Sequence, residues 1–376
     1  MTGELTELGI DDATASLLHQ YGFDPPTFHR LRERLRAEGA DPASNRLAAR
    51  VEPPPADAVR TLPAPGSAEH SEMVARGEEA IAEGRVGTLV LAGGMATRFG
   101  GVVKATVEAV DGRTFLELKV AGARRAAERA SARVPVFVMT SFATDAEVRR
   151  AAERLSSDAA PVTCFPQTIS LRLTPDAELF RTPAGELSPY APGHGDTPSA
   201  FAASGLLARF QDGGGRHLAM SNVDNLGATL DPAVIGAHLA GGASLTAEVV
   251  AKEPGDKGGA PARVDGRVEI VEAFRFPEGF DQDTIGVFNT NTFVLDASAL
   301  AREYELTWFA VRKTVEGQPA SQFERLGGQL TAFVESRFLE VPRQGPTGRF
   351  QPVKDPAELD RRRPDIRSLL TTRGIL

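Results

Sequence analysis

The stretch that decides the fold is "GTLVLAGGMATRFGGVVK", residues 87 to 104. An apolar run breaks abruptly into two adjacent glycines, which are followed by an arginine, two more glycines and a lysine. Glycine lets backbone N–H groups approach an anion closely, and the cations Arg98 and Lys104 supply charge that a phosphate attracts. We therefore predict that a buried strand ends here in a phosphate-binding loop.

Three alternative patterns could account for these glycines. A P-loop requires G-x-x-x-x-G-K-[ST], and that spacing is absent here. A dinucleotide fingerprint requires G-x-G-x-x-G at the start of a helix, whereas a second strand at 104–110 is expected here. A tight turn at the end of a strand would account for Gly93 and Gly94, but not for the two cations that follow them.

Strands and helices are expected to alternate downstream of this loop. Short apolar runs separated by amphipathic segments indicate an α/β fold with a doubly wound, mainly parallel, Rossmann-like sheet. We predict strands at 87–92, 134–141, 161–166, 216–222 and 244–252, and helices at 115–130, 145–155, 200–211 and 232–241.

The two ends of the chain have a different pattern of residues. Apolar residues three and four positions apart predict helices at 13–22, 27–40 and 68–83, and the proline-rich stretch 51–66 predicts a linker or an extended strap. Beyond residue 260, strand and turn signals predict an antiparallel extension with strands within 262–274, 286–295 and 330–336. We accordingly expect a helical N-terminal segment (1–84), a catalytic domain (85–340) and a short C-terminal segment (341–376).

Composition limits the classes of partner. The 376 residues carry a formal net charge of −8, which argues against broad binding to nucleic acid or to anionic lipid. No run of 18 apolar residues and no signal-peptide pattern occurs, and the one cysteine, Cys164, fits a reducing cytosol and is expected to be a small core residue. We expect a cytoplasmic protein without a nucleic-acid or membrane partner.

Further motifs follow the glycine loop in a fixed order. They are "CFPQ" (164–167), "PGHGD" (192–196), "SNVDNLGATLD" (221–231), "KGG" (257–259), "VEIVE" (268–272), "FNTN" (288–291), "SQFE" (321–324) and "VPRQGPTGRFQPVK" (341–354). Together with "LAGGMATRFG", these motifs resemble the UDP-sugar pyrophosphorylases, that is, the eukaryote-type UTP–glucose-1-phosphate uridylyltransferases and the related UTP–N-acetylhexosamine-1-phosphate uridylyltransferases. The resemblance implies a glycosyltransferase-A-type fold and a catalysed attack of a sugar-1-phosphate on the α-phosphorus of UTP.

This reaction brings two polyanions together, so its main demands are charge neutralisation and in-line positioning. By resemblance, Lys104 and Lys354 contact phosphates, together with Arg98 of the loop. Asp224 follows a predicted strand, where a carboxylate suits Mg²⁺, although an aspartate at that position could also cap a helix. A lysine such as Lys354 could otherwise be a solvated surface residue.

The remaining site residues are assigned by their chemistry and by the resemblance. The amide of Gln167 can donate to and accept from the edge of uracil. His194 is expected to donate to the sugar phosphate and not to act as a base, because that phosphate, with its second pKa near 6, is already largely deprotonated at neutral pH; a structural turn histidine is the alternative. The expected nucleotide-binding residues are Leu91, Ala92, Gly93, Gly94, Gln167 and Asn222, and the expected substrate-binding residues are His194, Gly195, Gly259, Glu272, Asn289 and Asn291.

Two departures from the family pattern leave the substrate open. Ala96 stands where a third glycine is usual, and Val103 stands where a proline usually precedes the lysine. Glucose-1-phosphate is the expected acceptor; N-acetylhexosamine-1-phosphate, a cyclitol phosphate, another nucleoside triphosphate or a non-catalytic nucleotide-sugar binder are the alternatives. Since the sequence ends soon after Lys354, without room for the family's C-terminal β-helix, a monomer or small homo-oligomer is expected.

Overall fold

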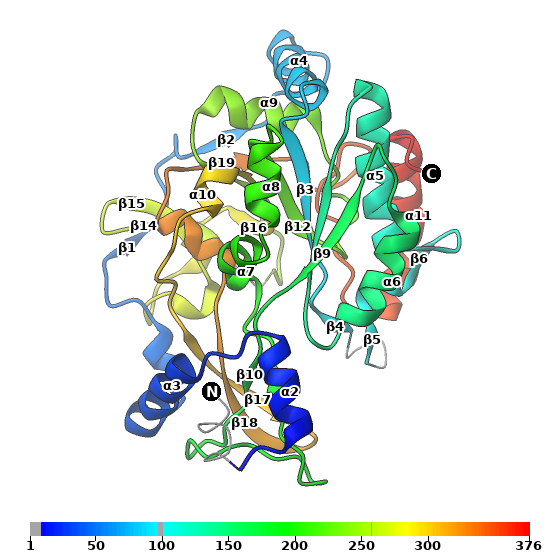
Figure 1. The fold of residues 1–376 in the computed structure, drawn as a ribbon. Coiled ribbons are helices and arrows are strands. Elements are labelled where there is room, and N and C mark those ends of the chain that lie inside the picture. Colours follow the sequence, from blue (N-terminus) through cyan, green and yellow to red (C-terminus); the bar gives the residue numbers. More distant parts are fainter. Residues whose placement is uncertain (1–8, 97–100, 257) are drawn as a thin grey trace.

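A computed structural model describes residues 9–96, 101–256 and 258–376, so Arg98 lies outside the described residues. Its centre is an eight-stranded sheet in which every strand is parallel except β16, which runs antiparallel to both of its neighbours (Figure 1). The order across the sheet is β2 (Val59–Thr61), β19 (Ser336–Glu340), β13 (Leu245–Ala251), β16 (Val287–Asp296), β12 (His217–Asn222), β3 (Val86–Leu91), β8 (Val136–Thr140) and β9 (Val162–Pro166).

Both faces of this sheet are buried. Along β3, Val86 and Val90 belong to one hydrophobic cluster, whereas Leu89 and Leu91 belong to another, because alternate side chains of a strand point to opposite faces. The predicted doubly wound, mainly parallel α/β fold is therefore confirmed.

Helices cover the two faces unequally. The first cluster contains residues of the five longer helices, and the second contains residues of three short ones, which lie in front of the sheet in Figure 1. The longer helices are α4 (Ala68–Ala82), α5 (Phe115–Ala130), α6 (Asp145–Leu155), α9 (Pro232–Gly241) and α11 (Pro356–Thr372); the short ones are α7 (Thr197–Ala203), α8 (Leu206–Asp212) and α10 (Ala297–Leu300).

A lower lobe is built from the N-terminal helices and two hairpins (Figure 1). Their apolar side chains form a separate core, in which Phe28 and Leu31 lie with Leu171 and Phe323. The elements are α2 (Asp12–Gln20), α3 (Pro25–Glu38), β10 (Ser170–Leu171), β11 (Pro189–Tyr190), β17 (Phe309–Val315) and β18 (Gln318–Glu324).

The proline-rich stretch is a strap with two short strands. Within it, β1 (Val51–Glu52) pairs with the hairpin of β14 (Ala260–Val264) and β15 (Arg267–Val271), and β2 pairs with β19 of the main sheet. Near the glycine loop the short strands are β4 (Met95–Ala96), β5 (Val102–Val103), β6 (Glu108–Val110) and β7 (Arg113–Thr114).

Four predictions of individual helices and strands were wrong. The helix expected at 200–211 is two helices, because Gly205 has a φ of +72° between them. Lys104 opens a 3-10 turn (Lys104–Thr106) and does not begin a strand. The strand expected in the antiparallel extension at 286–295 is β16, inside the main sheet, and 330–336 is mostly a 3-10 helix (Gly327–Ala332) that precedes β19.

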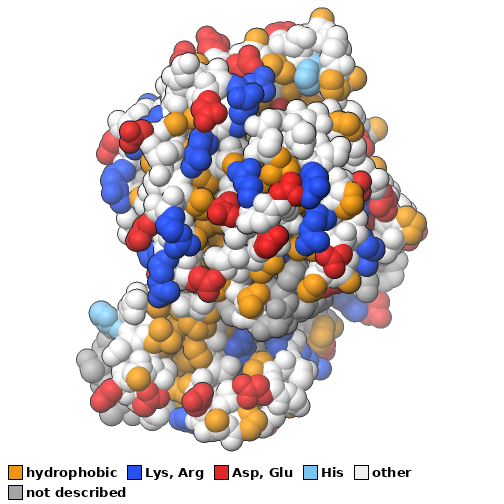
Figure 2. All heavy atoms as spheres, turned by 90° about the vertical axis from the view of Figure 1, so that its right-hand side faces the viewer, with side chains coloured by type: hydrophobic (Ala, Val, Ile, Leu, Met, Phe, Trp, Pro, Cys, Tyr) orange, Lys and Arg blue, Asp and Glu red, His pale blue; other side chains and the backbone are white. Residues whose placement is uncertain are grey.

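Cys164 is a core residue, as expected: it is buried on β9, and burial raises the pKa of its thiol to about 11. Among the described residues, no helix has both the length and the apolar character required to cross a membrane. Acidic and basic side chains are interspersed on the face that Figure 2 shows, so any large anion must be bound by cations gathered locally.

Candidate active site

A cleft of about 550 Å³ opens at the carboxyl ends of β3, β9 and β12. This is the edge at which open α/β sheets bind ligands. Its lining combines the glycine loop with both predicted lysines, the predicted metal ligand and the predicted base-reading amide. It consists of Leu91, Gly93, Gly94, Lys104, Met139, Gln167, Ala191, Gly193, His194, Asn222, Val223, Asp224 and Lys354.

Gln167 lies directly against the glycine loop. A Cβ on Gly93 would come within 2.2 Å of the Gln167 Nε2 atom, so only glycine allows this approach. The Gly193 N–H donates to Gln167 Oε1 at 3.1 Å, which leaves the Nε2 amide as a donor at the cleft. By contrast, the backbone groups of Ala92 are already used, by the Met139 carbonyl and the Thr144 hydroxyl, so the geometry does not support its contact with a base.

The ammonium group of Lys104 donates to a carboxylate oxygen of Asp224. Both side chains are mostly buried, with 17% and 18% of their surfaces exposed, so each charge has little water to stabilise it except through the other. Asp224 is the only carboxylate among the described residues that line the cleft. One carboxylate fits Mg²⁺, because this ion keeps several waters and takes its other ligands from substrate phosphates.

His194 is held as a neutral imidazole. Burial lowers its pKa to about 4, and the Gly327 N–H donates to its Nδ1 atom at 2.9 Å. Because Nδ1 accepts a hydrogen bond, the ring proton must lie on Nε2, which can then donate. Gly195 packs elsewhere: its N–H donates to the Arg325 carbonyl at 2.9 Å, and a Cβ would collide with that peptide, so the structure gives it a packing role.

The residues expected to contact the sugar do not line this cleft, but contacts through Asn289 and Asn291 link them to Asn222, which does. The Asn289 N–H donates to the Gly259 carbonyl at 2.8 Å, and a Cβ on Gly259 would lie 3.1 Å from Glu272 Oε1. Burial raises the pKa of Glu272. Asn291 donates through Nδ2 to Asn222 Oδ1 at 2.9 Å.

A bulge in β16 directs Asn291 toward β12. The register between β13 and β16 shifts at this point, and Asn291 takes a φ of +54°, a conformation that asparagine tolerates better than most residues. Its Oδ1 atom is buried and has no hydrogen-bond partner among the described residues. This atom is therefore an unsatisfied, buried acceptor on a side chain that bonds to Asn222 of the cleft.

The C-terminal segment that carries Lys354 is anchored by residues that sequence reasoning missed. The buried guanidinium of Arg349 bonds to both oxygens of Glu248 at 2.6 and 2.7 Å. Asn225 donates to the Arg349 carbonyl at 3.1 Å and accepts from the Gln351 N–H at 2.8 Å. The one signal for this anchor in the sequence was Glu248, a glutamate inside an apolar, buried strand. A buried charge requires a partner of opposite charge, which here is Arg349.

A second missed residue, Lys119, supports the loop that carries Asp224. Its buried ammonium group donates to Ser221 Oγ and to the Ala228 carbonyl, each at 2.8 Å, and so bridges the two ends of that loop. Burial lowers the pKa of Lys119 to about 7. The signal in the sequence was a lysine on the apolar face of α5, four residues before Ala123.

Comparison with known proteins identifies the family to which this chain belongs. A family model described as UTP–glucose-1-phosphate uridylyltransferase matches residues 28–369, and the chain belongs to this family. UTP–glucose-1-phosphate uridylyltransferase 2 of Dictyostelium discoideum is 28% identical over 331 residues, which cover 82% of this chain. The match spans 63% of the length of that relative, a little under two thirds.

Two solved structures share the fold. The uridine diphosphate N-acetylglucosamine pyrophosphorylase of Trypanosoma brucei superposes with a TM-score of 0.77 at 21% identity, covering 96% of this chain and 81% of its own. A UDP-glucose pyrophosphorylase variant from Leishmania major, solved in complex with UDP-glucose, gives 0.70 at 22% identity, covering 93% and 78%.

The lowered pKa of Lys119 predicts a distinct pH dependence of stability. Between about pH 7 and its unfolded pKa of 10.5, the unfolded chain holds this proton and the folded chain does not. The free energy of unfolding should therefore rise with pH over this interval, by about 1.4 kcal/mol per pH unit from this group. Urea unfolding at pH 7.5 and 9 should give a steeper rise for the wild type than for Lys119→Met.

The matched control is Lys313→Met, which removes an exposed lysine on β17 and should keep the wild-type slope. Equal slopes in the wild type and in Lys119→Met would contradict a lysine whose pKa is lowered by burial.

Proposed function

We propose that this chain is a Mg²⁺-dependent uridylyltransferase that forms UDP-glucose and pyrophosphate from UTP and glucose-1-phosphate. The observation that carries the proposal is one cleft lined by a base-reading amide, two lysines, a carboxylate and a neutral histidine. The family assignment and the names of its relatives support the same activity. A cytosolic location remains a prediction from the sequence.

The uracil is proposed to lie against the glycine loop. Gln167 Nε2 is a hydrogen-bond donor, and the Oε1 atom of the same amide already accepts from the Gly193 N–H. A donor matches a uracil carbonyl but opposes the amino group of cytosine, which leaves a buried polar group unpaired. The Gly93 carbonyl already accepts from the Ser141 hydroxyl at 2.8 Å, so the Gly93 N–H and the backbone of Gly94 are proposed to complete the contact. A side chain at Gly93 would collide with Gln167.

The phosphates are proposed to lie between Lys104, Lys354 and Asp224. The two ammonium groups neutralise charge on the triphosphate and on the pyrophosphate that leaves. Arg98 remains a further candidate from the sequence. When bound, Mg²⁺ would supply charge neutralisation at the phosphate oxygens, held to the protein through Asp224. Lys104 would hold the Asp224 carboxylate in the orientation needed for that purpose.

The acceptor is proposed to be oriented by His194 and by the asparagines of β16. The Nε2–H of His194 donates to the acceptor phosphate, whose own second pKa near 6 makes a general base unnecessary. Asn291 Oδ1, which is otherwise unpaired among the described residues, accepts from a sugar hydroxyl, and Glu272 and Asn289 complete the polar surface. This geometry positions an attacking oxygen that is already charged.

A matrix of four nucleoside triphosphates against glucose-1-phosphate, N-acetylglucosamine-1-phosphate and a cyclitol phosphate tests the proposal. Pyrophosphate release should be fastest with UTP and glucose-1-phosphate. UTP should exceed CTP in kcat/KM by roughly 10³-fold, because the mismatched base leaves donors facing donors. A preference for a purine nucleotide would refute uridylyl transfer, and tight UDP-glucose binding without turnover would indicate a non-catalytic binder.

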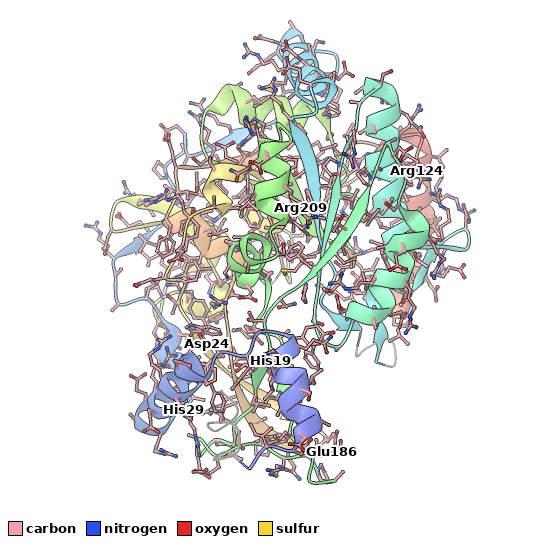
Figure 3. All side chains as sticks on the ribbon, viewed as in Figure 1. His19, Asp24, His29, Arg124, Glu186 and Arg209 are labelled. Carbon is pink, nitrogen blue, oxygen red and sulfur yellow. The ribbon has the colours of Figure 1, made fainter. Side chains whose placement is uncertain are left out.

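His194→Gln should reduce kcat/KM for the acceptor by about 10²- to 10³-fold, the usual effect of losing one preorganised donor. The acid limb of the pH profile near pH 6 should persist in this variant, because it reports protonation of the acceptor phosphate and not of a histidine. His29→Gln, at an exposed position on α3 (Figure 3), serves as the control. Loss of the acid limb in His194→Gln would show that His194 is a base.

Asp224→Asn keeps the shape of the side chain but removes the charge that Mg²⁺ needs. We expect turnover to require far more magnesium, or to collapse. Chelation should abolish wild-type turnover, and readdition of Mg²⁺ should restore it. Full activity in excess EDTA would exclude a metal role for Asp224.

A further inference from the structure

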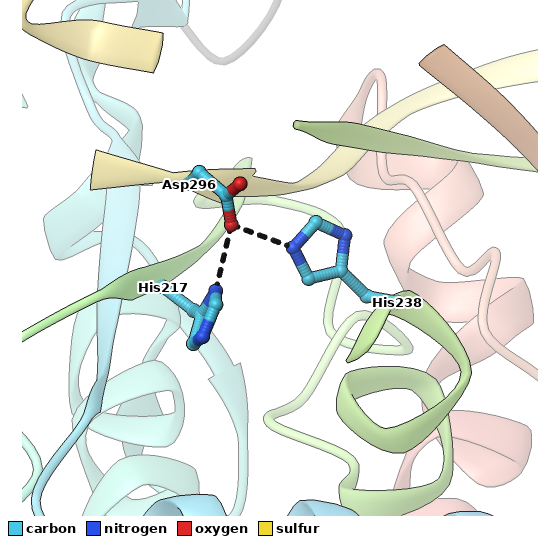
Figure 4. A group of neighbouring side chains, drawn as sticks. All are labelled: His217, His238 and Asp296. Carbon is cyan, nitrogen blue, oxygen red and sulfur yellow. Dashed lines mark hydrogen bonds and ion pairs between the residues drawn. The ribbon is translucent and has the colours of Figure 1, made fainter. Parts of the chain in front are cut away.

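Two histidines and an aspartate meet at the edge of the sheet opposite to the cleft. His217 begins β12, Asp296 ends β16, and His238 lies in the last turn of α9. Figure 4 shows a nitrogen of each ring directed at the same carboxylate oxygen, with Nδ1 of His217 at 2.8 Å and Nε2 of His238 at 3.1 Å from Asp296 Oδ1. Nothing in the proposed uridylyl transfer uses this cluster.

The donor set and spacing fit a small divalent transition ion. Zn²⁺ binds histidine nitrogen and carboxylate oxygen at about 2.0–2.2 Å, so tetrahedral ligands lie about 3.3 Å apart. The three ligand atoms here lie within 4.8 Å of one another, and the two nitrogen–oxygen distances, 2.8 and 3.1 Å, are about 0.5 and 0.2 Å shorter than that spacing. The ligands come from three core elements, so little chain must be ordered to bind an ion.

The surroundings supply the features that accompany metal-binding histidines. Thr246 Oγ1 lies 2.9 Å from Nδ1 of His238, and a ligating imidazole usually has its other nitrogen bonded to an oxygen. A hydroxyl suits both states, since it can donate to Nδ1 without an ion and accept from Nδ1–H with one. His238 is only 2% exposed, whereas 29% of the Asp296 side chain is exposed, which leaves a solvent side for a fourth, water ligand.

We propose that His217, His238 and Asp296 bind one Zn²⁺ ion as a structural site, separate from the Mg²⁺ site at Asp224. The ion joins β12, β16 and α9 at their shared edge. His217 and Asn222 lie at opposite ends of β12, about 17 Å apart at the usual rise of a strand. The ion would therefore hold the far end of the two strands that present Asn222 and Asn291 to the cleft.

The first test counts bound ions in protein dialysed against a chelator and then equilibrated with Zn²⁺. The Asp224→Asn variant should retain one equivalent, because the cleft does not hold this ion, and excess Mg²⁺ should not displace it. Its Tm should rise with zinc concentration, as expected for an ion that binds only the folded chain. Failure to retain zinc at micromolar free concentrations would overturn the site.

The second test uses variants. His217→Gln should weaken zinc binding at least about 100-fold, and Thr246→Val by about 10- to 100-fold, the range observed for outer-sphere partners. His29→Gln should bind zinc as the wild type does. Equal affinity in His217→Gln and the wild type would place the ion elsewhere and overturn the proposal.

Co²⁺ gives a readout that does not depend on the stability of a variant. Added to the ion-free wild type, it should produce the strong visible absorption of a four-coordinate site, and one equivalent of Zn²⁺ should abolish it. If Co²⁺ gave no more than the weak absorption of a six-coordinate ion, the imidazoles would not be ligands. That result would contradict the site even if the variants failed to fold.

Discussion

The buried ion pair between Arg349 and Glu248 is the interaction on which the architecture of the cleft depends. Glu248 lies inside β13, at 1% exposure, and Arg349 lies in the C-terminal segment, so the pair attaches that segment to the centre of the sheet. Removal of one partner from such a pair usually costs about 3–5 kcal/mol, because the other charge is left buried and uncompensated. Lys354 follows five residues later and lines the cleft, so this attachment helps to place it there.

The loop after β12 is also anchored by buried polar contacts. Asn225 bonds to the backbone on both sides of Phe350, while Lys119 joins the two ends of the loop from below. The carboxylate of Asp224 is thus supported by partners from α5 and from the C-terminal segment. In the proposed reaction, the groups that meet two polyanions are held by neighbours far away in sequence, which would reduce reorganisation when charge develops.

The sequence predicted the fold well where the signal was local. Apolar runs located β3, β8, β9, β12 and β13, and the boundaries of α5, α6 and α9 agree with the structure. It failed where tertiary pairing decides: the alternation in 286–295 indicates a strand but not its antiparallel place between β12 and β13. Likewise, motif order indicated Gln167 and Asp224, whereas the roles of Lys119 and Arg349 depend on partners more than 100 residues away.

A neutral His194 suits a cleft that two lysines already line. In the proposed transfer, a protonated imidazole would strengthen binding of the acceptor phosphate and of the product to a similar extent, and such uniform binding would not accelerate the chemical step. Burial and the Gly327 N–H instead keep one directed Nε2–H donor. In an acidic chain, the positive charge of the described cleft residues is thereby concentrated on Lys104 and Lys354, where the proposed transfer would place the reacting phosphates. The histidine would orient the acceptor without adding net charge.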